Sequence, residues 1–216
     1  SEDLNSGHPM LRLLQGDVGS GKTIVAAAAI LSAVASGKQA ALMSPTEILA
    51  EQHRDTLTSW FVELGFKLVF LSGKTKGKAR QAVLEMIATG AADIIIGTHA
   101  LFQDDVVFSD LSLVVIDEQH RFGVNQRILL GEKGKSKNSH PHQLIMTATP
   151  IPRTLAMSHY SDLDTYVIDE LPPGRTPVIS IAISSPRRLQ VISHVRVSVS
   201  IAPQVYCVCT PIDASY

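Results

Sequence analysis

The stretch GDVGSGKT, from Gly16 to Thr23, constrains the fold of this chain more than any other part of it. It matches the pattern G-x-x-x-x-G-K-[ST] and stands between an apolar run, Leu11–Gln15, and an apolar helical pattern, Lys22–Ser36. Glycines in such a loop let backbone N–H groups turn inward around an anion, and the helix N-terminus adds partial positive charge. The stretch therefore predicts a phosphate site at a strand-to-helix turn, and its context argues against a chance glycine-rich turn.

The residues of this loop have expected roles in binding the phosphates of a nucleotide. Lys22 is expected to reach the β- and γ-phosphates, and Thr23 to offer its hydroxyl to Mg²⁺. The predicted ATP-binding residues are Gly16, Asp17, Val18, Gly19, Ser20, Gly21, Lys22 and Thr23.

Apolar runs alternate with helical patterns along most of the chain, which is typical of a parallel α/β sheet with helices on its faces. The runs are continuous, so we expect strands that are buried on both faces. The expected strands are Leu11–Gln15, Gln39–Pro45, Lys67–Gly73, Ala92–His99, Leu111–Glu118, His142–Pro150 and Thr165–Glu170. The expected helices are Lys22–Ser36 with Gly37 as its stop, Thr46–Leu64, and Lys76–Thr89 with Gly90 as its stop.

Two carboxylates, Asp117 and Glu118, end the fifth expected strand. At the end of a buried strand they would cost desolvation energy unless something pairs with them. Beside a phosphate loop, Asp117 fits the carboxylate that holds Mg²⁺ together with Thr23. Glu118 then fits the group that orients or deprotonates the attacking water. An acid pair that merely ends a strand is the alternative, and the predicted catalytic residues are Lys22, Asp117 and Glu118.

Further polar residues follow the acid pair and the sixth strand. Thr147 and Thr149 flank Ala148 in MTATPIPRT, and they could bridge Asp117 or His120 to a moving element. A polar strand end before a proline turn is the competing interpretation. The residues predicted to sense the nucleotide state are Gln119, His120, Thr147, Ala148 and Thr149.

Other expected strand ends carry short polar side chains suited to a phosphodiester backbone. In an open parallel sheet, ligands bind at the carboxyl edge of the strands. The net charge is −1, so any nucleic-acid contact has to be local. Thr46 could instead cap a helix, and a basic run is by default a solvated loop. The predicted DNA contacts are Thr46, Thr98, His99, Lys74, Lys76, Lys78 and Arg80.

The segment ELPPGRTPV, Glu170–Val178, carries three prolines and a glycine and is interpreted as a linker. It divides an ATP-binding unit at residues 1–169 from residues 179–216. The latter are expected to form a strand at Val178–Ser184, a helix near Pro186–Val199 and a strand at Gln204–Thr210. Such a βαβ unit cannot bury a core by itself, so its apolar face should be exposed.

Together these stretches resemble the motor of a superfamily 2 helicase. The resemblance is carried, in order from about Glu2 to Val178, by LLQGDVGSGKT, PTEILAEQH, IIIGTHALFQ, DEQHRFGVNQR, HQLIMTATPIPRTLAM and VIDELPPGRTPV. It implies two RecA-like lobes with ATP and Mg²⁺ between them. It also implies remodelling of branched double-stranded DNA by a monomer with an N-terminal wedge domain. This chain would contain the first lobe and only the start of the second, and would lack the wedge.

Alternatives remain open at this point. The motor of the transcription-repair coupling factor is similar, but its acid box typically reads DEEH where Gln119 stands here; the primosomal helicase is more distant. A P-loop kinase would normally carry an arginine-rich lid, which is not found in this sequence. The chain could also bind nucleotide or DNA without turnover. Without the second lobe's arginine, we expect the chain alone to be nearly inert as an ATPase.

The sequence carries no sign of membrane insertion or export. No apolar run reaches the roughly 18 residues of a membrane span. The first ten residues lack the basic start and apolar core of a signal peptide. A cytoplasmic protein is expected.

Overall fold

The structure, a computed structural model, describes residues 9–118, 140–149, 164–169, 180–201 and 205–206. The chain divides into two compact units, residues 1–173 and residues 174–216, and the division falls inside the proline-rich segment. Within the described ranges, no helix is both long and apolar enough to cross a membrane.

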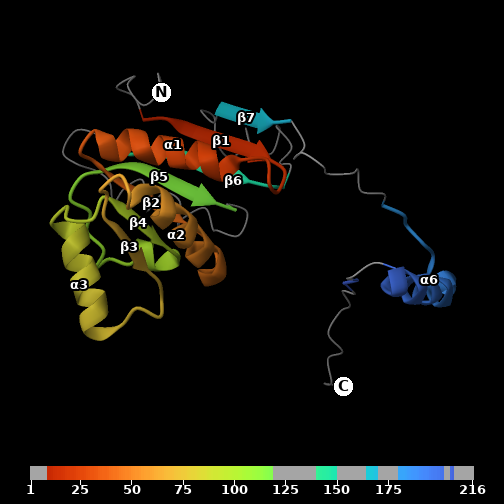
Figure 1. Cartoon of the computed structure of the whole chain (residues 1–216). Helices are drawn as coiled ribbons and strands as arrows, with labels where there is room; N and C mark the ends of the chain where they lie inside the picture. The colour runs from red at the N-terminus through yellow and green to blue at the C-terminus, as the bar shows by residue number, and fades with distance from the viewer. Residues whose placement is uncertain (1–8, 119–139, 150–163, 170–179, 202–204, 207–216) are drawn as a thin grey trace. The chain divides into compact units, whose positions relative to one another are not determined.

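One sheet of seven parallel strands forms the first unit (Figure 1). The strands are β1 (Leu11–Gly16), β2 (Gln39–Met43), β3 (Leu68–Leu71), β4 (Ile94–Gly97), β5 (Leu111–Asp117), β6 (His142–Thr147) and β7 (Asp164–Ile168). Their order across the sheet is β3-β4-β2-β5-β6-β1-β7. Every pair of neighbours is parallel, so all carboxyl ends meet at one edge. The predicted parallel α/β architecture is confirmed.

Helices cover both faces of this sheet. On one face, α1 (Lys22–Ala35) and α2 (Glu47–Phe61) share a core with the sheet, in which Ala26 and Ile30 of α1 cluster with Leu42 and Val115. On the other face lie α3 (Gly77–Ala88) and the short 3₁₀ helix η2 (His99–Phe102). Each helix follows a strand, which is the arrangement that brings the loops after the strands to the carboxyl edge.

Burial differs between the centre and the ends of the sheet. Strands β2 and β4 are buried along their whole length, as their continuous apolar runs predict. The same prediction is wrong for β7, where Tyr166 is 54% exposed and Val167 59% exposed. The physical reason is position: among the described strands β7 pairs only with β1, so it lies at the edge of the sheet.

The second unit contains η4 (Ser185–Arg187) and α6 (Arg188–Ile201), which corresponds to the helix expected there. The strand expected before it is wrong for residues 180–184, which are neither helix nor strand. A strand needs a hydrogen-bonded neighbour, and the described part of this unit supplies none. Most of the second expected strand lies outside the described residues. Helix α6 leaves Leu189 77% exposed, together with Val197 and Val199.

Candidate functional site

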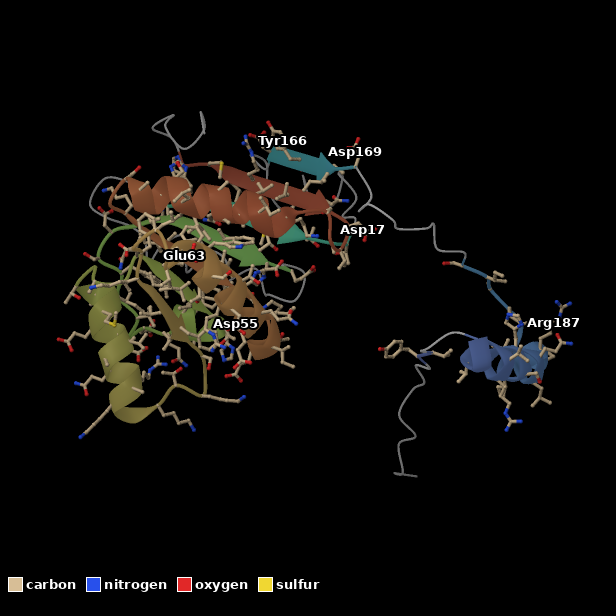
Figure 2. All side chains as sticks on the ribbon, in the orientation of Figure 1. Asp17, Asp55, Glu63, Tyr166, Asp169 and Arg187 are labelled. Atoms are coloured by element: carbon tan, nitrogen blue, oxygen red, sulfur yellow. The ribbon has the colours of Figure 1, made fainter. Side chains whose placement is uncertain are left out.

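Strand β1 delivers the glycine-rich loop to the carboxyl edge of the sheet, where Asp17 follows its last residue (Figure 2). Gly19 (φ 82°) and Gly21 (φ 93°) are both left-handed, a conformation that other residues rarely adopt. Helix α1 begins directly after Gly21 without a side-chain cap, so its first amide groups can bind an anion. A Cβ built on Gly21 meets no atom within 4 Å, which leaves open space at this helix end.

Lys22 lies back over the same loop. Its Nζ donates to the carbonyl oxygen of Gly16 at 2.6 Å and to that of Asp17 at 2.8 Å. The turn is closed by the Ser20 N–H, which donates to the Asp17 carbonyl at 3.1 Å. Ser20 Oγ is buried and has no hydrogen-bond partner among the described residues. A Cβ on Gly16 would lie 2.5 Å from that oxygen and 3.0 Å from Ile168 Cβ, so a larger residue there would force these side chains to shift.

Asp117 ends β5 at the same edge and is 8% exposed. Its Oδ2 lies 2.7 Å from Nε2 of His53, which comes from α2. Strand β6 lies between β5 and β1, so the axes of the two strands that lead to Asp117 and to the glycine-rich loop are about 10 Å apart, twice the spacing of neighbouring strands. That separation can accommodate a phosphate chain with a metal ion beside Asp117.

Glu118 is held in a restricted conformation just beyond the strand. Its φ of 51° is left-handed, which is uncommon for a residue other than glycine. Its backbone N–H donates to the Met146 carbonyl at 2.9 Å, and its Oε1 accepts from the Ala148 N–H at 3.3 Å. These bonds to β6 and its end fix the carboxylate at the edge of the sheet. Positive φ at a polar residue is often found at functional sites.

The two threonines after β6 bond to each other. The Oγ1 atoms of Thr147 and Thr149 are 2.9 Å apart, and the Thr149 N–H donates to Thr147 Oγ1 at 3.1 Å. The structure links this segment to Glu118 through the Ala148 N–H. The bridge from Asp117 or His120 to a moving element, which the sequence suggested, stays a prediction. The predicted sensor residues Gln119 and His120 lie outside the described residues.

The oxygen atoms at this edge fit a magnesium ion. Mg²⁺ is usually bound through one or two carboxylates together with substrate phosphates and water. Asp117 and the hydroxyl of Thr23 supply that kind of donor set beside the phosphate loop. Within the described residues there is no cluster of three or more His, Cys, Asp or Glu residues that could hold a metal ion.

The predicted DNA-contact residues lie at the carboxyl ends of β2, β3 and β4, which form the other half of the same edge. Thr46 caps α2, since its Oγ1 accepts from the Leu49 N–H at 3.4 Å. His99 is exposed. Thr98 is only 4% exposed, so its burial does not support a contact with DNA.

Two of the basic residues near these strand ends are already engaged. Lys74 Nζ lies 2.7 Å from Glu47, and Ser72 Oγ also donates to Glu47 at 2.7 Å. The Lys74 ammonium, with the smaller help of Ser72, lowers the pKa of Glu47, and Glu47 raises the pKa of Lys74. Arg80 bonds to both carboxylate oxygens of Asp105, at 2.8 and 2.9 Å, and this pairing ties α3 to the loop after η2.

Lys76 and Lys78 are exposed at the start of α3. They therefore remain the better candidates within the basic run for a contact with a phosphate backbone.

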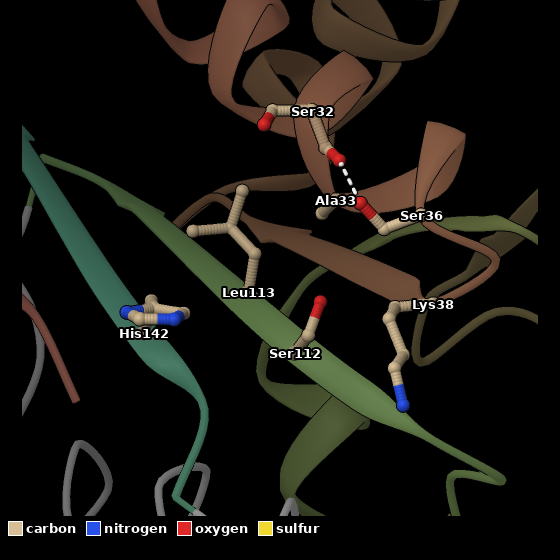
Figure 3. A pocket seen from close by; sticks show the side chains of 7 residues that line it. All are labelled: Ser32, Ala33, Ser36, Lys38, Ser112, Leu113 and His142. Atoms are coloured by element: carbon tan, nitrogen blue, oxygen red, sulfur yellow. Dashed lines mark hydrogen bonds between the residues drawn. The ribbon is translucent and has the colours of Figure 1, made fainter. Parts of the chain in front are cut away.

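A pocket of about 300 Å³ lies at the opposite, amino-terminal edge of the sheet (Figure 3). Its lining residues are Ser32, Ala33, Ser36, Lys38, Ser112, Leu113 and His142. The last turn of α1 forms one wall, and a helix C-terminus carries partial negative charge. Lys38, the cation of the lining, is paired with Asp110. The pocket therefore does not suit a nucleotide.

His53 is the site residue that sequence reasoning missed. It stands at the end of the stretch PTEILAEQH, in which Thr46 was the predicted site residue. In α2 the fully buried residues Ala50 and Leu57 lie seven apart, and His53 lies between them at the same helical spacing. A histidine in register with the buried face of a helix was the available signal.

Comparison with known proteins places this geometry in a family. The model of the DEAD/DEAH box helicase family matches residues 2–171. The chain is 62% identical over 215 residues to the ATP-dependent DNA helicase RecG of Pasteurella multocida (strain Pm70), covering 99% of this chain and 31% of that protein. It is 61% identical to RecG of Escherichia coli (strain K12), covering 96% of this chain and 30% of that one.

Solved structures agree with these relatives. A structure of RecG bound to a three-way DNA junction matches with a TM-score of 0.73 and 39% identity, covering 94% of this chain and 28% of that one. The C-terminal domain of the DEAD-box protein Dbp5 matches at 12% identity with a TM-score of 0.55, over 76% of this chain and 92% of that domain, which shows a shared fold.

The chain spans about a third of the length of the curated relatives it matches. Its predicted resemblance to a superfamily 2 motor is confirmed, and so is the predicted RecA-like fold. The chain belongs to the DEAD/DEAH box helicase family, and within it the motor resembles that of the RecG helicases.

Proposed function

We propose that this chain is the ATP-binding motor lobe of a cytoplasmic DNA helicase that remodels branched DNA at stalled forks and junctions. The observation that carries the proposal is the assembly of three elements at one sheet edge. These are the glycine-rich loop with Lys22, the acid pair Asp117–Glu118, and the segment Thr147–Thr149 bonded to Glu118. High identity to relatives named ATP-dependent DNA helicase RecG, together with the similar structure of RecG bound to a three-way DNA junction, supports branched DNA as the partner.

Different residues of the glycine-rich loop bind different parts of the ATP phosphate chain. The amide groups around Gly19 and Gly21 and at the start of α1 face phosphate oxygens. Lys22 exchanges the carbonyl oxygens of Gly16 and Asp17 for phosphate oxygens, since its side chain already lies over the loop. Because a charged donor then meets a charged acceptor, the new contacts are stronger than the ones they replace.

We assign the hydrolysis of ATP to the acid pair, Asp117 and Glu118. Thr23 and Asp117 hold Mg²⁺, which when bound neutralises negative charge on the β- and γ-phosphates. Glu118 orients the attacking water and accepts its proton. A change at Glu118 reaches Thr147 and Thr149 through the Ala148 N–H, so this segment can respond to hydrolysis. Gln119 and His120 are proposed to join the same polar network.

The remaining parts of the motor belong to the complete protein. We assign residues 1–169 to the first RecA-like lobe, residues 170–178 to the linker and residues 179–216 to the start of the second lobe. The second lobe supplies an arginine to the transferred phosphate, which is worth about 10³–10⁵ in rate in related phosphate chemistry. A wedge domain separates the DNA strands, and the complete protein acts as a monomer.

DNA is proposed to follow the carboxyl ends of β2, β4 and β3. Thr46 and His99 lie at two of these ends, and Lys76 and Lys78 lie beside the third. Charged contacts to phosphates give affinity that falls steeply with salt. The strand order separates this half of the edge from the nucleotide half at β5, β6 and β1.

The test is ATP hydrolysis by the complete protein with forked DNA, linear duplex or no DNA. We expect the forked DNA to stimulate hydrolysis most, and Lys22→Ala to abolish it. Equal stimulation by fork and linear duplex would favour a duplex translocase such as the transcription-repair coupling factor. ATP consumption that is indifferent to DNA and transfers the γ-phosphoryl group to a small molecule instead of to water would show a kinase.

A further inference from the structure

In the described part of the chain, a hydrogen bond between His53 and Asp117 joins helix α2 to the acid pair at the end of β5. Nε2 of His53 lies 2.7 Å from Oδ2 of Asp117, and each side chain is 12% exposed. An ionised carboxylate only accepts hydrogen bonds, so the imidazole N–H is the donor. The contact occupies one carboxylate oxygen and leaves Oδ1 for another partner.

The surroundings hold His53 firmly. Its helix, α2, starts at the Thr46 cap and packs Ala50 and Leu57 against the sheet, where both are fully buried. The strand before it, β2, pairs with β5 along the sheet, with Met43 opposite Ile116. Helix and carboxylate are therefore attached to neighbouring strands, and the imidazole meets Asp117 from a fixed direction.

We propose that His53 is a positioning residue that orients the Asp117 carboxylate for Mg²⁺. This inference rests on the function proposed above. Mg²⁺ demands near-ideal octahedral geometry, and a site with one protein carboxylate gains most when that carboxylate is pre-oriented. The His53 N–H on Oδ2 stops rotation of the carboxylate, so that Oδ1 is the oxygen offered to the metal. Partners of this kind typically change metal affinity by about 10–100-fold when removed.

The competing role for His53 is compensation of a buried charge. In that case the metal and the imidazole would compete for Asp117, and removing the imidazole would leave the magnesium requirement unchanged or lower it. The two roles therefore predict different results for one measurable quantity, the Mg²⁺ concentration at which nucleotide affinity is half restored: the positioning role predicts an increase, and charge compensation predicts none.

The same helix also reaches the proposed DNA half of the edge. Its first turn carries Glu47, which bonds to Ser72 and Lys74 at the end of β3. Through His53, the helix that starts among these residues is attached to the metal-binding carboxylate.

The experiment measures affinity for a slowly hydrolysed ATP analogue by calorimetry, in EDTA and across a Mg²⁺ titration. The chain is compared with His53→Ala, His53→Gln and His53→Phe. The control is Asp55→Ala, on the same helix, whose side chain is 70% exposed and labelled in Figure 2. Thermal unfolding of each variant is recorded alongside.

We expect His53→Ala and His53→Phe to require about tenfold more Mg²⁺, with unchanged affinity in EDTA. Glutamine places an N–H at a similar reach, so His53→Gln should retain most of the wild-type behaviour, and Asp55→Ala all of it. His53→Phe preserves the ring volume, so it carries the test if His53→Ala does not fold.

A wild-type Mg²⁺ requirement in His53→Phe would overturn the inference, because the ring would then act by packing alone. A lowered requirement would show that histidine competes with the metal, and would overturn it as well. A different result would overturn the proposed function itself. In that case the nucleotide affinity of the wild-type chain would not depend on Mg²⁺, and Lys22→Ala would bind the nucleotide as tightly as the wild type.

Discussion

Glu118 Oε1 accepts a hydrogen bond from the Ala148 N–H at 3.3 Å, so the proposed water-activating carboxylate is bonded to the backbone between two threonines. The contact joins the ends of two neighbouring strands, β5 and β6. Because the donor is a backbone N–H, no substitution at residue 148 other than proline can remove it. Variants at Glu118 therefore separate the chemical role of the carboxylate from its role as a hydrogen-bond acceptor.

Glu118→Gln should keep nucleotide binding and lose turnover. The amide oxygen can still accept from the Ala148 N–H, whereas the proton acceptor for water is gone. We expect hydrolysis by the complete protein to fall by roughly 10²–10⁴-fold, measured as single-turnover phosphate release with forked DNA. Wild-type turnover in this variant would show that Glu118 is merely an acid at the end of a strand.

Lys22→Ala should weaken ATP binding by tenfold or more, because a charge-assisted hydrogen bond is worth roughly 1.5–3 kcal/mol. Calorimetry in the presence of Mg²⁺ measures the effect. The matched control is Lys38→Ala, which removes a lysine paired with Asp110 at the opposite edge of the sheet. Equal affinity of both variants would remove the phosphate-loop interpretation.

Gly97→Ala should destabilise the first unit. A Cβ there would lie 2.1 Å from the Leu71 carbonyl oxygen and 3.1 Å from Leu101 Cγ, so two strands would have to separate. We expect the free energy of unfolding to fall by about 3 kcal/mol, at the upper end for overpacking. Gly73→Ala is the control, since a Cβ at Gly73 meets nothing within 4 Å. Urea denaturation measures the free energy of unfolding of both variants. Equal values for Gly97→Ala and Gly73→Ala would show that β3 and β4 can move apart freely.

Replacing Lys76 and Lys78 by alanine should reduce the salt dependence of DNA binding. Removal of one phosphate contact lowers the slope of log affinity against log salt by about 0.9. Fluorescence anisotropy with forked DNA over a range of salt concentrations gives this slope. Lys67→Ala removes an exposed lysine just before β3, at the other edge, and should leave the slope unchanged. Identical slopes for the wild type, the variant with both lysines replaced and Lys67→Ala would exclude the start of α3 as a DNA contact.

Lys74→Ala should raise the pKa of Glu47 toward its ordinary value of 4.5, because the Lys74 hydrogen bond is the largest cause of the lowered pKa. Ser72→Ala should raise it less. Since the folded pKa lies below the unfolded one, the stabilisation from this carboxylate is present above about pH 4.5 and is lost as the pH falls through the folded value. NMR titration of the Glu47 carboxyl group measures the shift, and an unchanged pKa in Lys74→Ala would contradict the pairing.

Local patterns were sufficient for most of the fold. Each strand of the first unit was predicted because parallel strands read as continuous apolar runs, and the stops at Gly37 and Gly90 were visible as glycines that adopt positive φ. The exposure of Tyr166 was not predictable, since the sequence of β7 does not reveal that it lies at the edge of the sheet. The expected strand near residues 180–184 failed for the related reason that a strand depends on a partner.

The candidate site was predictable where one segment carries the whole signal, as in the glycine-rich loop and the acid pair. Contacts between segments that lie far apart in the sequence were not predictable. The His53–Asp117 pair spans 64 residues, and the Glu118–Ala148 contact spans 30. The pairing of Arg80 with Asp105 likewise depends on how α3 meets the loop after η2, so a basic residue assigned to DNA proved to be engaged within the fold.

The strand order has a consequence for how the protein is made. Strand β1 is bonded only to β6 and β7 among the described strands, and its neighbour β6 begins about 130 residues later, as in the Met10–His142 hydrogen bond. Strands β2 to β5 can pair with one another as they leave the ribosome, whereas β1 must wait. The glycine-rich loop is thus synthesised early and anchored late. A nascent chain that ends before His142 would carry the entire loop sequence without β6, the strand that pairs with β1, so nucleotide binding would report the insertion of β6.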